Sequence, residues 1–332
     1  MIRRIPFGAM IILVPVALAV IAFELLAPFN IASQSDLALA GGAIPSNPFP
    51  KNMLLFMGLQ IVHVFVCTAS VTLSVRAVYE QNRVGFVPFL AFSVIMAFGI
   101  LSLFILLRPY DLVAYFFTHD FFVCFYSQTP IGEYWVHTKL FGLTILDLLV
   151  LTPTWLGVVA VIFAATASRT MLAYEPIYEP DEFEDADDAA RLALLKLITY
   201  GLAAVLCSSA LTATMYFHLP SIFLNQGIDS QMVQGAETTS AILTDLLERI
   251  RQFGADLSFY WSLIFSLTLI TAVGLPMLSV YVRQGSATLR EDNDFGSLMQ
   301  IGGSALGKAT MYLSPVIAGV LTRSLSIPGL SS

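Results

Sequence analysis

A few polar side chains that could do chemistry interrupt long apolar stretches of this sequence. His63, Asp147 and the pair Ser208 and Ser209 each lie well inside such a stretch. A charge at the centre of a lipid bilayer costs at least a few kcal/mol, so ionisable residues there pair with each other or mark a route for ions or protons. We therefore expect a polar cavity in which His63 and Asp147 relay protons or coordinate a cation. Three hydroxyl groups would support them, those of Ser208, Ser209 and Thr154.

Counting along each stretch places these groups at a similar depth. If the stretches are helices, His63 lies roughly 15 Å and Asp147 roughly 12 Å from the outer end. Ser208 and Ser209 fall at roughly 12–15 Å from the same side. Pro153 lies six residues after Asp147 in the same stretch. Proline lacks an N–H, so one helix carbonyl has no backbone donor and can accept a hydrogen bond from a hydroxyl group or water. A structural hydrogen bond between His63 and Asp147, joining two helices, explains the same pattern without transport.

Two sets of residues could bind a metal. His63 and Cys67 are four residues apart and share a helix face, so together with Cys207 they could hold a soft metal ion. A second set, near the ends of the apolar stretches, could form a zinc site or supply a general base. It comprises His119, Asp120, Glu133, His137 and His218. No HExxH, HxH or GxSxG motif frames these residues, so solvated side chains at the membrane surface are the alternative.

The composition indicates the elements that must position these residues. The chain has 332 residues, of which 57% are hydrophobic and only 12% are charged. A soluble domain averages about 45–50% apolar and about 25% charged residues. The composition therefore excludes a disordered chain, a collagen-like fibre and an ordinary soluble enzyme, and it indicates a polytopic membrane protein. The net charge is −7 without any basic tract, so nucleic acid is not an expected partner.

Six stretches are long enough to cross a bilayer, which takes about 20 mostly apolar residues in a helix. They lack the period-2 alternation of barrel strands, so the expected fold class is all-α. We expect a polytopic membrane helix bundle with about six transmembrane helices plus interfacial amphipathic helices. The first stretch could instead be a cleaved signal. The six stretches are residues 5–27, 53–75, 85–107, 140–167, 197–217 and 257–282.

Lys and Arg residues set the expected orientation. If the N-terminus is cytoplasmic, most of the 16 Lys and Arg residues fall on the inner side. This distribution favours a multipass protein of a bacterial-type inner membrane with both termini in the cytoplasm. The chain then divides into a first membrane half at 1–168, an acidic cytoplasmic loop at 169–192, a second membrane half at 193–282 and a cytoplasmic C-terminal segment at 283–332.

Several further segments could contact the membrane or a partner. The outer segment 109–138 contains an aromatic run at 112–126, which fits an interfacial or re-entrant helix. Residues 238–253 carry apolar and charged side chains at helical spacing, which predicts an amphipathic helix lying on the membrane or on a partner. The loop 175–188 is dense in carboxylates and is either solvated or a docking site for a cation or a basic partner. The apolar residues 310–322 are too few to span and fit an interfacial or re-entrant piece.

These patterns favour a transport or ion/proton-conducting role in contact with the lipid bilayer, with protein partners or further copies of the chain. The alternative is a non-catalytic integral membrane subunit of a multiprotein envelope complex, such as a secretion, conjugation or respiratory assembly. In that case the aromatic run, the amphipathic helix and the acidic loop would be docking surfaces. A metal-dependent enzyme is a third hypothesis. No motif assigns a cofactor or a substrate, and a role other than catalysis is favoured.

Overall fold

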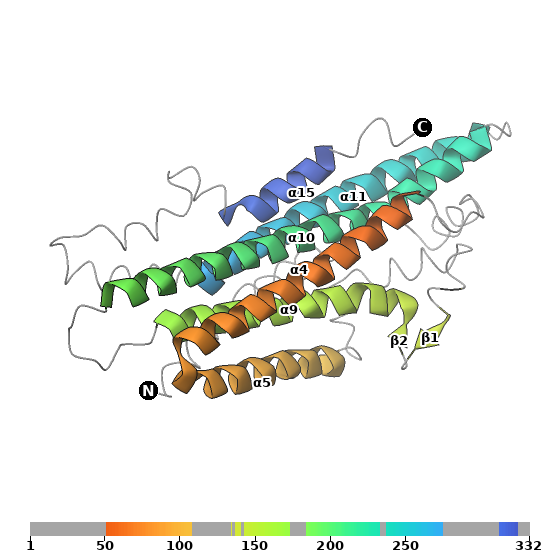
Figure 1. Cartoon of the computed structure of the whole chain (residues 1–332). Helices are drawn as coiled ribbons and strands as arrows, with labels where there is room; N and C mark the ends of the chain where they lie inside the picture. The colour runs from red at the N-terminus through yellow and green to blue at the C-terminus, as the bar shows by residue number, and fades with distance from the viewer. Residues whose placement is uncertain are drawn as a thin grey trace.

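Long helices packed side by side form one elongated bundle (Figure 1). The computed structural model describes residues 51–107, 134, 137–140, 143–172, 184–232, 237–274 and 312–324. The described elements in chain order are α4 (Lys51–Gln81), α5 (Arg83–Leu107), β1 (Lys139–Leu140), β2 (Leu143–Thr144), α9 (Ile145–Leu172), α10 (Glu184–Met232), α11 (Glu237–Leu269), the π-helix η3 (Ile270–Gly274) and α15 (Ser314–Ser324).

Five of the described helices are long and apolar enough to cross a membrane. They match five of the six expected stretches, and the sixth, residues 5–27, lies outside the described residues. The expected helical membrane bundle is confirmed at this level, whereas the full number of spans and their orientation stay predictions. The five segments are Leu54–Gln81, Arg83–Ser102, Thr152–Met171, Ala193–Gln226 and Ala241–Val273.

A single residue, Asn82, joins α4 to α5. Its backbone N–H donates to the carbonyl oxygen of Val78 at 2.8 Å, and its side-chain Oδ1 accepts from the backbone N–H of Gly85 at 2.7 Å. Asn82 is therefore the N-cap of α5, a position at which asparagine satisfies a backbone donor that the helix leaves unpaired. The guanidinium of Arg83 lies 5.6 Å from the ring centre of Tyr79 beside this turn.

The fourth expected span begins later than predicted. Instead of a helix from residue 140, Lys139 pairs with Thr144 and Leu140 pairs with Leu143 in a short antiparallel ladder. The backbone N–H of Ile145 donates to the carbonyl oxygen of Thr138 at 3.2 Å, and α9 starts there. The hydrophobicity of residues 140–144 suits a short hairpin as well as a helix, so composition did not separate the two.

The last two expected spans are much longer than predicted. α10 has 49 residues and α11 has 33, whereas a span needs about 20. Both continue past the N-terminal ends of α4 and α9 (Figure 1), so most of the residues between the expected spans 197–217 and 257–282 belong to these two helices. We call this part, residues 220–232 of α10 and 237–251 of α11, the α10–α11 extension.

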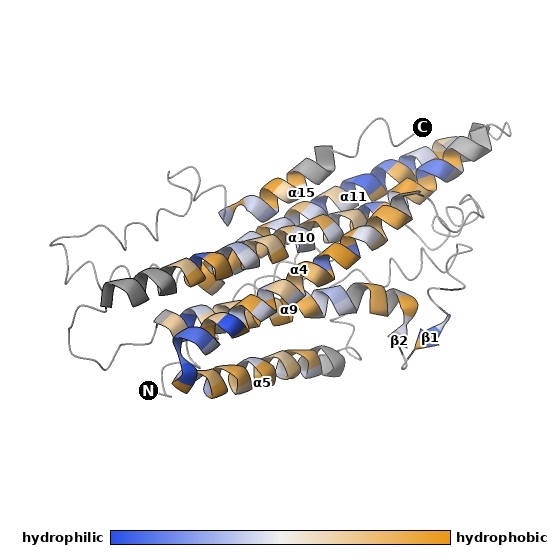
Figure 2. Cartoon of the chain, in the orientation of Figure 1, coloured by the Kyte–Doolittle hydropathy of each residue, from blue (hydrophilic) through white to orange (hydrophobic). Residues whose placement is uncertain are grey.

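The apolar face of the expected amphipathic helix at 238–253 packs on α10 within the same chain. Leu243, Leu246 and Ile250 are buried in one cluster with Leu224 and Ile228 of α10. The opposite face of α11 is polar (Figure 2) and carries an ion pair of 3.1 Å between Arg249 and Asp245. This arrangement differs from the expected contact with the membrane or a partner, because α10 already covers the apolar face.

The C-terminal apolar piece expected at 310–322 contains α15, which packs against both α10 and α11. Ser314 hydrogen bonds to Cys207 of α10. Gly319 lies directly against Ser262 of α11, with no room for a Cβ atom. Both contacted residues lie inside candidate spans, so this position favours the re-entrant interpretation over an interfacial helix.

The core consists of two apolar clusters at different levels of the bundle. One is built around residues such as Phe217 and Leu246 near the α10–α11 extension, and the other around Phe163 and Leu202 towards the opposite end. A small cluster of Cys67, Ala160 and Val205 lies where α4, α9 and α10 meet. Polar groups gather beside this small cluster.

Candidate functional site

His63 lies at a contact of three helices. It is 2% exposed. Its Nδ1 is 2.8 Å from Oγ of Ser208 in α10, and its Nε2 is 3.0 Å from the backbone carbonyl oxygen of Pro153 in α9. We call His63, Gln60, Pro153, Gly157 and Ser208 the His63 junction. The sequence predicted that His63 and Ser208 lie at one level, and the structure brings them into direct contact.

Gln60 of α4 compensates for the proline in α9. Pro153 has no N–H, so the carbonyl oxygen of Leu149, four residues earlier, loses its usual helical donor. The side-chain Nε2 of Gln60 donates to this carbonyl oxygen at 3.2 Å. One turn further along, His63 bonds the carbonyl of Pro153 itself. α4 therefore supplies two side chains to the interrupted part of α9.

A double-mutant cycle tests this compensation. In Pro153→Ala the backbone N–H at position 153 can donate to Leu149, so the Gln60 donor becomes redundant. We expect Gln60→Leu to be more destabilising, by about 1 kcal/mol, in the wild-type background than in Pro153→Ala. Thermal unfolding in mild detergent compares the stability of the wild type, the two single variants and the double variant. Equal effects of Gln60→Leu in both backgrounds would show that the two positions are independent.

Gly157 of α9 leaves room for the imidazole ring. A Cβ atom at this position would lie 3.5 Å from Nε2 of His63 and 3.6 Å from Oγ of Ser209. These are ordinary contact distances, so alanine fits there, while a larger side chain would need the space of the ring. Ser209, another residue predicted for the site, thus lies next to the junction, and its hydroxyl donates to the carbonyl oxygen of Val205 at 2.9 Å.

The partners of His63 accommodate two protonation states. A carbonyl oxygen only accepts, so Nε2 carries a hydrogen and donates it to Pro153. Oγ of Ser208 is 2.8 Å from both Nδ1 of His63 and the carbonyl oxygen of Val205. With neutral imidazole, Ser208 donates to Nδ1, and Val205 still receives the hydroxyl of Ser209. With imidazolium, Nδ1 donates to Ser208, which donates to Val205. Binding of one proton at Nδ1, together with rotation of one hydroxyl group, therefore converts one fully bonded state into the other.

Of the three residues predicted to hold a soft metal ion, only His63 and Cys67 lie close together. Sγ of Cys67 is 3.4 Å from Nε2 of His63, as the four-residue spacing predicts. Cys207 instead hydrogen bonds to Ser314 of α15. Within the described part of the chain, no group of three or more His, Cys, Asp or Glu side chains is placed to share a metal ion.

Asp147 and Thr154 occupy different places relative to the junction. Asp147 belongs to the first turn of α9, one and a half turns before Pro153 and thus about 9 Å away along the helix axis. The side chain of Asp147 lies outside the described part of the chain. Thr154 is half-buried and directly follows Pro153. The expected pairing of His63 with Asp147 stays a prediction, and the described partners of His63 are Ser208, Pro153 and Cys67.

Of the second set of possible metal ligands, the structure describes only His137 and His218. His119, Asp120 and Glu133 lie outside the described residues. His137 is exposed in the turn before β1, and His218 is half-buried in α10. The backbone carbonyl oxygen of His218 accepts from the hydroxyl of Ser221 at 2.8 Å.

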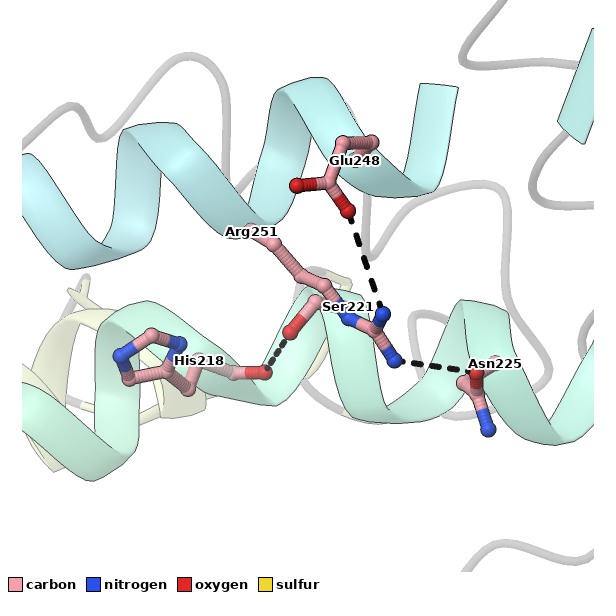
Figure 3. A network of polar contacts seen from close by, with 5 residues as sticks. All are labelled: His218, Ser221, Asn225, Glu248 and Arg251. Carbon is pink, nitrogen blue, oxygen red and sulfur yellow. Dashed lines mark hydrogen bonds and ion pairs between the residues drawn. The ribbon is translucent and has the colours of Figure 1, made fainter. Parts of the chain in front are cut away.

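Figure 3 shows the surroundings of His218, where Arg251 of α11 reaches towards α10. Nη2 of Arg251 donates to Oδ1 of Asn225 at 3.1 Å, and its Nη1 is 4.0 Å from Oε2 of Glu248. The contact with Asn225 joins α11 to α10, whereas the contact with Glu248 lies within α11.

One face of α4 carries a row of buried polar residues, of which the sequence analysis identified only His63 and Cys67. Gln60, His63, Cys67, Ser70 and Ser74 recur every three or four residues, which is the spacing of one helix face. His63, Cys67, Ser70 and Ser74 are each at most 2% exposed, and Gln60 is half-buried. We call these five residues the α4 polar stripe. Their spacing alone could have revealed it.

An open, largely apolar groove lies beside the His63 junction between α4 and α9. Gln60 and Val64 line it from α4, and Leu149, Thr152 and Pro153 line it from α9. Two members of the junction, Gln60 and Pro153, are therefore reached from the surface of the described bundle.

The comparisons with known proteins found no matching family model, no similar curated protein and no similar solved structure. The fold is a helical bundle with five described helices long and apolar enough to cross a membrane and with a buried histidine where three of its helices meet.

Proposed function

We propose that the protein conducts protons across a bacterial-type inner membrane and that His63 is the proton-binding residue of the path. The observation that supports this most strongly is the His63 junction, because its hydrogen bonds are complete with the ring neutral and with the ring protonated. An ionisable side chain in the interior of a membrane bundle is a candidate functional group by default, since its burial is costly.

The α4 polar stripe supports a path rather than an isolated site. From Gln60 to Ser74 it extends for about 21 Å along α4, which is roughly two thirds of a hydrocarbon core of about 30 Å. Oγ of Ser70 is buried without a hydrogen-bond partner among the described residues. A Cβ atom at Gly201 of α10 would lie 3.4 Å from this oxygen, so α10 packs closely against the Ser70 hydroxyl. In this proposal the Ser70 hydroxyl takes part in the path between His63 and the inner end.

In this proposal the groove between α4 and α9 is the entrance on one side. Nε2, on the side of Pro153, already carries a hydrogen, so the proton would be taken up by Nδ1 on the side of Ser208, while rotation of the Ser208 hydroxyl restores the hydrogen bonds. The supporting roles expected for Ser209 and Thr154 belong to the same proposal, and Asp147 would lie nearer the entrance. Proton flux into proteoliposomes that contain wild-type protein or His63 variants tests the proposal.

The α10–α11 extension supports a second possible function, which is to bind another protein. The described part of this two-helix projection has an internal apolar seam and charged side chains on the outer face of α11, among them Asp245, Glu248 and Arg249, so it is suited to hold a partner at a fixed distance from the bundle. We propose docking of another envelope protein there as the alternative function. Purification in mild detergent would then yield a stoichiometric complex. Arg249→Glu would release the partner without removing the contact of Arg251 with Asn225 that joins α11 to α10. A monomer or small homo-oligomer from wild-type cells would count against this role.

A further inference from the structure

Arg169 in the last turn of α9 carries hydrogen-bond donors that lack a partner. Its Nε and Nη1 atoms are buried and have no hydrogen-bond acceptor among the described residues. A guanidinium group stays charged in proteins, and buried donors of a charged group that lack an acceptor are costly. The geometry therefore points to an anion that completes the site.

The described side chains around Arg169 supply apolar packing. The residues that follow it in α9 pack with α10 and η3 in one apolar cluster that includes Met171, Leu195 and Val273. Charged side chains described at this end include Lys196 of α10, Arg83 of α5 and Arg76 of α4. In α4 the carboxylate of Glu80 already bonds Arg76 at 2.7 Å.

The depth of Arg169 matches the headgroup layer. It follows Pro153 by about 24 Å along α9 and lies near the end of the apolar segment Thr152–Met171. Guanidinium groups bind phosphate with two parallel hydrogen bonds. Basic pockets between transmembrane helices at the cytoplasmic face bind anionic headgroups. We propose that Arg169 binds the phosphate of an anionic phospholipid where α9 meets α10 and η3.

The acidic segment 175–188 of the same chain is the competing occupant. Met171 of α9 packs in one cluster with Leu195 and Ile198 of α10. Because the two helices are antiparallel, the acidic first turn of α10 around Glu184 lies more than about 13 Å further along the axis. That distance exceeds the length of an arginine side chain, so the carboxylates of this first turn do not reach Arg169. Residues 175–183 lie outside the described part of the chain, and the experiment below tests them as occupants.

Lipid titration of the full-length protein, read by native mass spectrometry, tests this inference. The probes are phosphatidylglycerol and phosphatidylcholine. We expect wild-type protein to retain phosphatidylglycerol preferentially, and Arg169→Gln to weaken that binding about tenfold. The matched control is Arg76→Gln, because Arg76 is exposed and already paired with Glu80, and it should bind phosphatidylglycerol as wild type does.

Three outcomes would overturn the inference. The first is unchanged phosphatidylglycerol binding in Arg169→Gln. The second is displacement of the lipid by millimolar inorganic phosphate, which would assign the site to a free anion. The third is a gain in lipid binding when the carboxylates at 175–188 are converted to amides, which would make that segment the occupant. If Arg169→Gln fails to fold, phosphatidylglycerol binding by Arg169→Lys provides the test. This variant keeps the charge without the paired donors, so several-fold weaker binding supports the proposal and unchanged binding contradicts it.

Discussion

Replacing His63 by glutamine is expected to abolish proton flux while leaving the bundle folded. The glutamine amide can donate to the carbonyl oxygen of Pro153 and accept from Ser208, so the contacts among α4, α9 and α10 are largely kept. An amide does not titrate, so the path loses its proton-binding group. We expect flux in proteoliposomes to fall at least about tenfold, towards the level of empty liposomes.

The alanine variant separates the two roles of His63. His63→Ala removes both hydrogen bonds and leaves a cavity at a site that is 2% exposed, so we expect a loss of about 2–4 kcal/mol of stability in addition to the loss of flux. His137→Ala is the matched control, because His137 is exposed and should change neither property. If His63→Gln conducted like wild type, His63 would be a structural cross-link between helices and nothing more.

Adding one methyl group at Gly254 is expected to separate α10 from α11. A Cβ atom at this position would lie 2.7 Å from the backbone carbonyl oxygen of Phe217 and 3.3 Å from the carbonyl carbon. These are backbone atoms of a helix, so they cannot rotate away as a flexible side chain would. We expect Gly254→Ala to lower the free energy of unfolding by about 1–3 kcal/mol, measured by thermal unfolding in mild detergent.

Gly58 of α4 provides the control for this substitution. A Cβ atom there would meet no heavy atom within 4 Å. Gly58→Ala should therefore be neutral or stabilising by about 0.5–1 kcal/mol, because alanine has the higher helix propensity. Equal effects of the two substitutions would mean that α10 and α11 do not approach closely at Gly254.

The sequence was sufficient to place His63 and Ser208 at one level. Long apolar stretches indicate where the membrane helices lie, and counting residues from the helix ends gives the depth of a side chain in the membrane. Two polar residues on different helices could therefore be assigned to the same depth. The side-chain partners could not be predicted in the same way, because they depend on helix rotation and neighbour order. Gln60 illustrates this limit: its role requires that α4 lie beside Pro153, which composition alone does not determine.

Helix ends were the weakest part of the sequence prediction. The α10–α11 extension was read as an outer segment with one amphipathic helix, because helical spacing does not say what the apolar face contacts. Leu243 and Leu246 pack on α10, so the helix needs no membrane or partner to cover them. Similarly, the predicted depth of Asp147 assumes a helix that begins at Lys139, and the β1–β2 ladder moves that start to Ile145.

The most direct test of the central claim is the protonation of His63 itself. Nitrogen NMR of ring-labelled histidine in lipid bilayers can follow the imidazole over the pH range in which flux is measured, with His63→Gln identifying the signal. The structure predicts that at high pH only Nε2 carries a hydrogen, and that acidification protonates Nδ1 while signals from Pro153 and Ser208 show the helix contacts intact. A ring that stays neutral throughout that range, while flux persists, would contradict the proposal that His63 carries the proton.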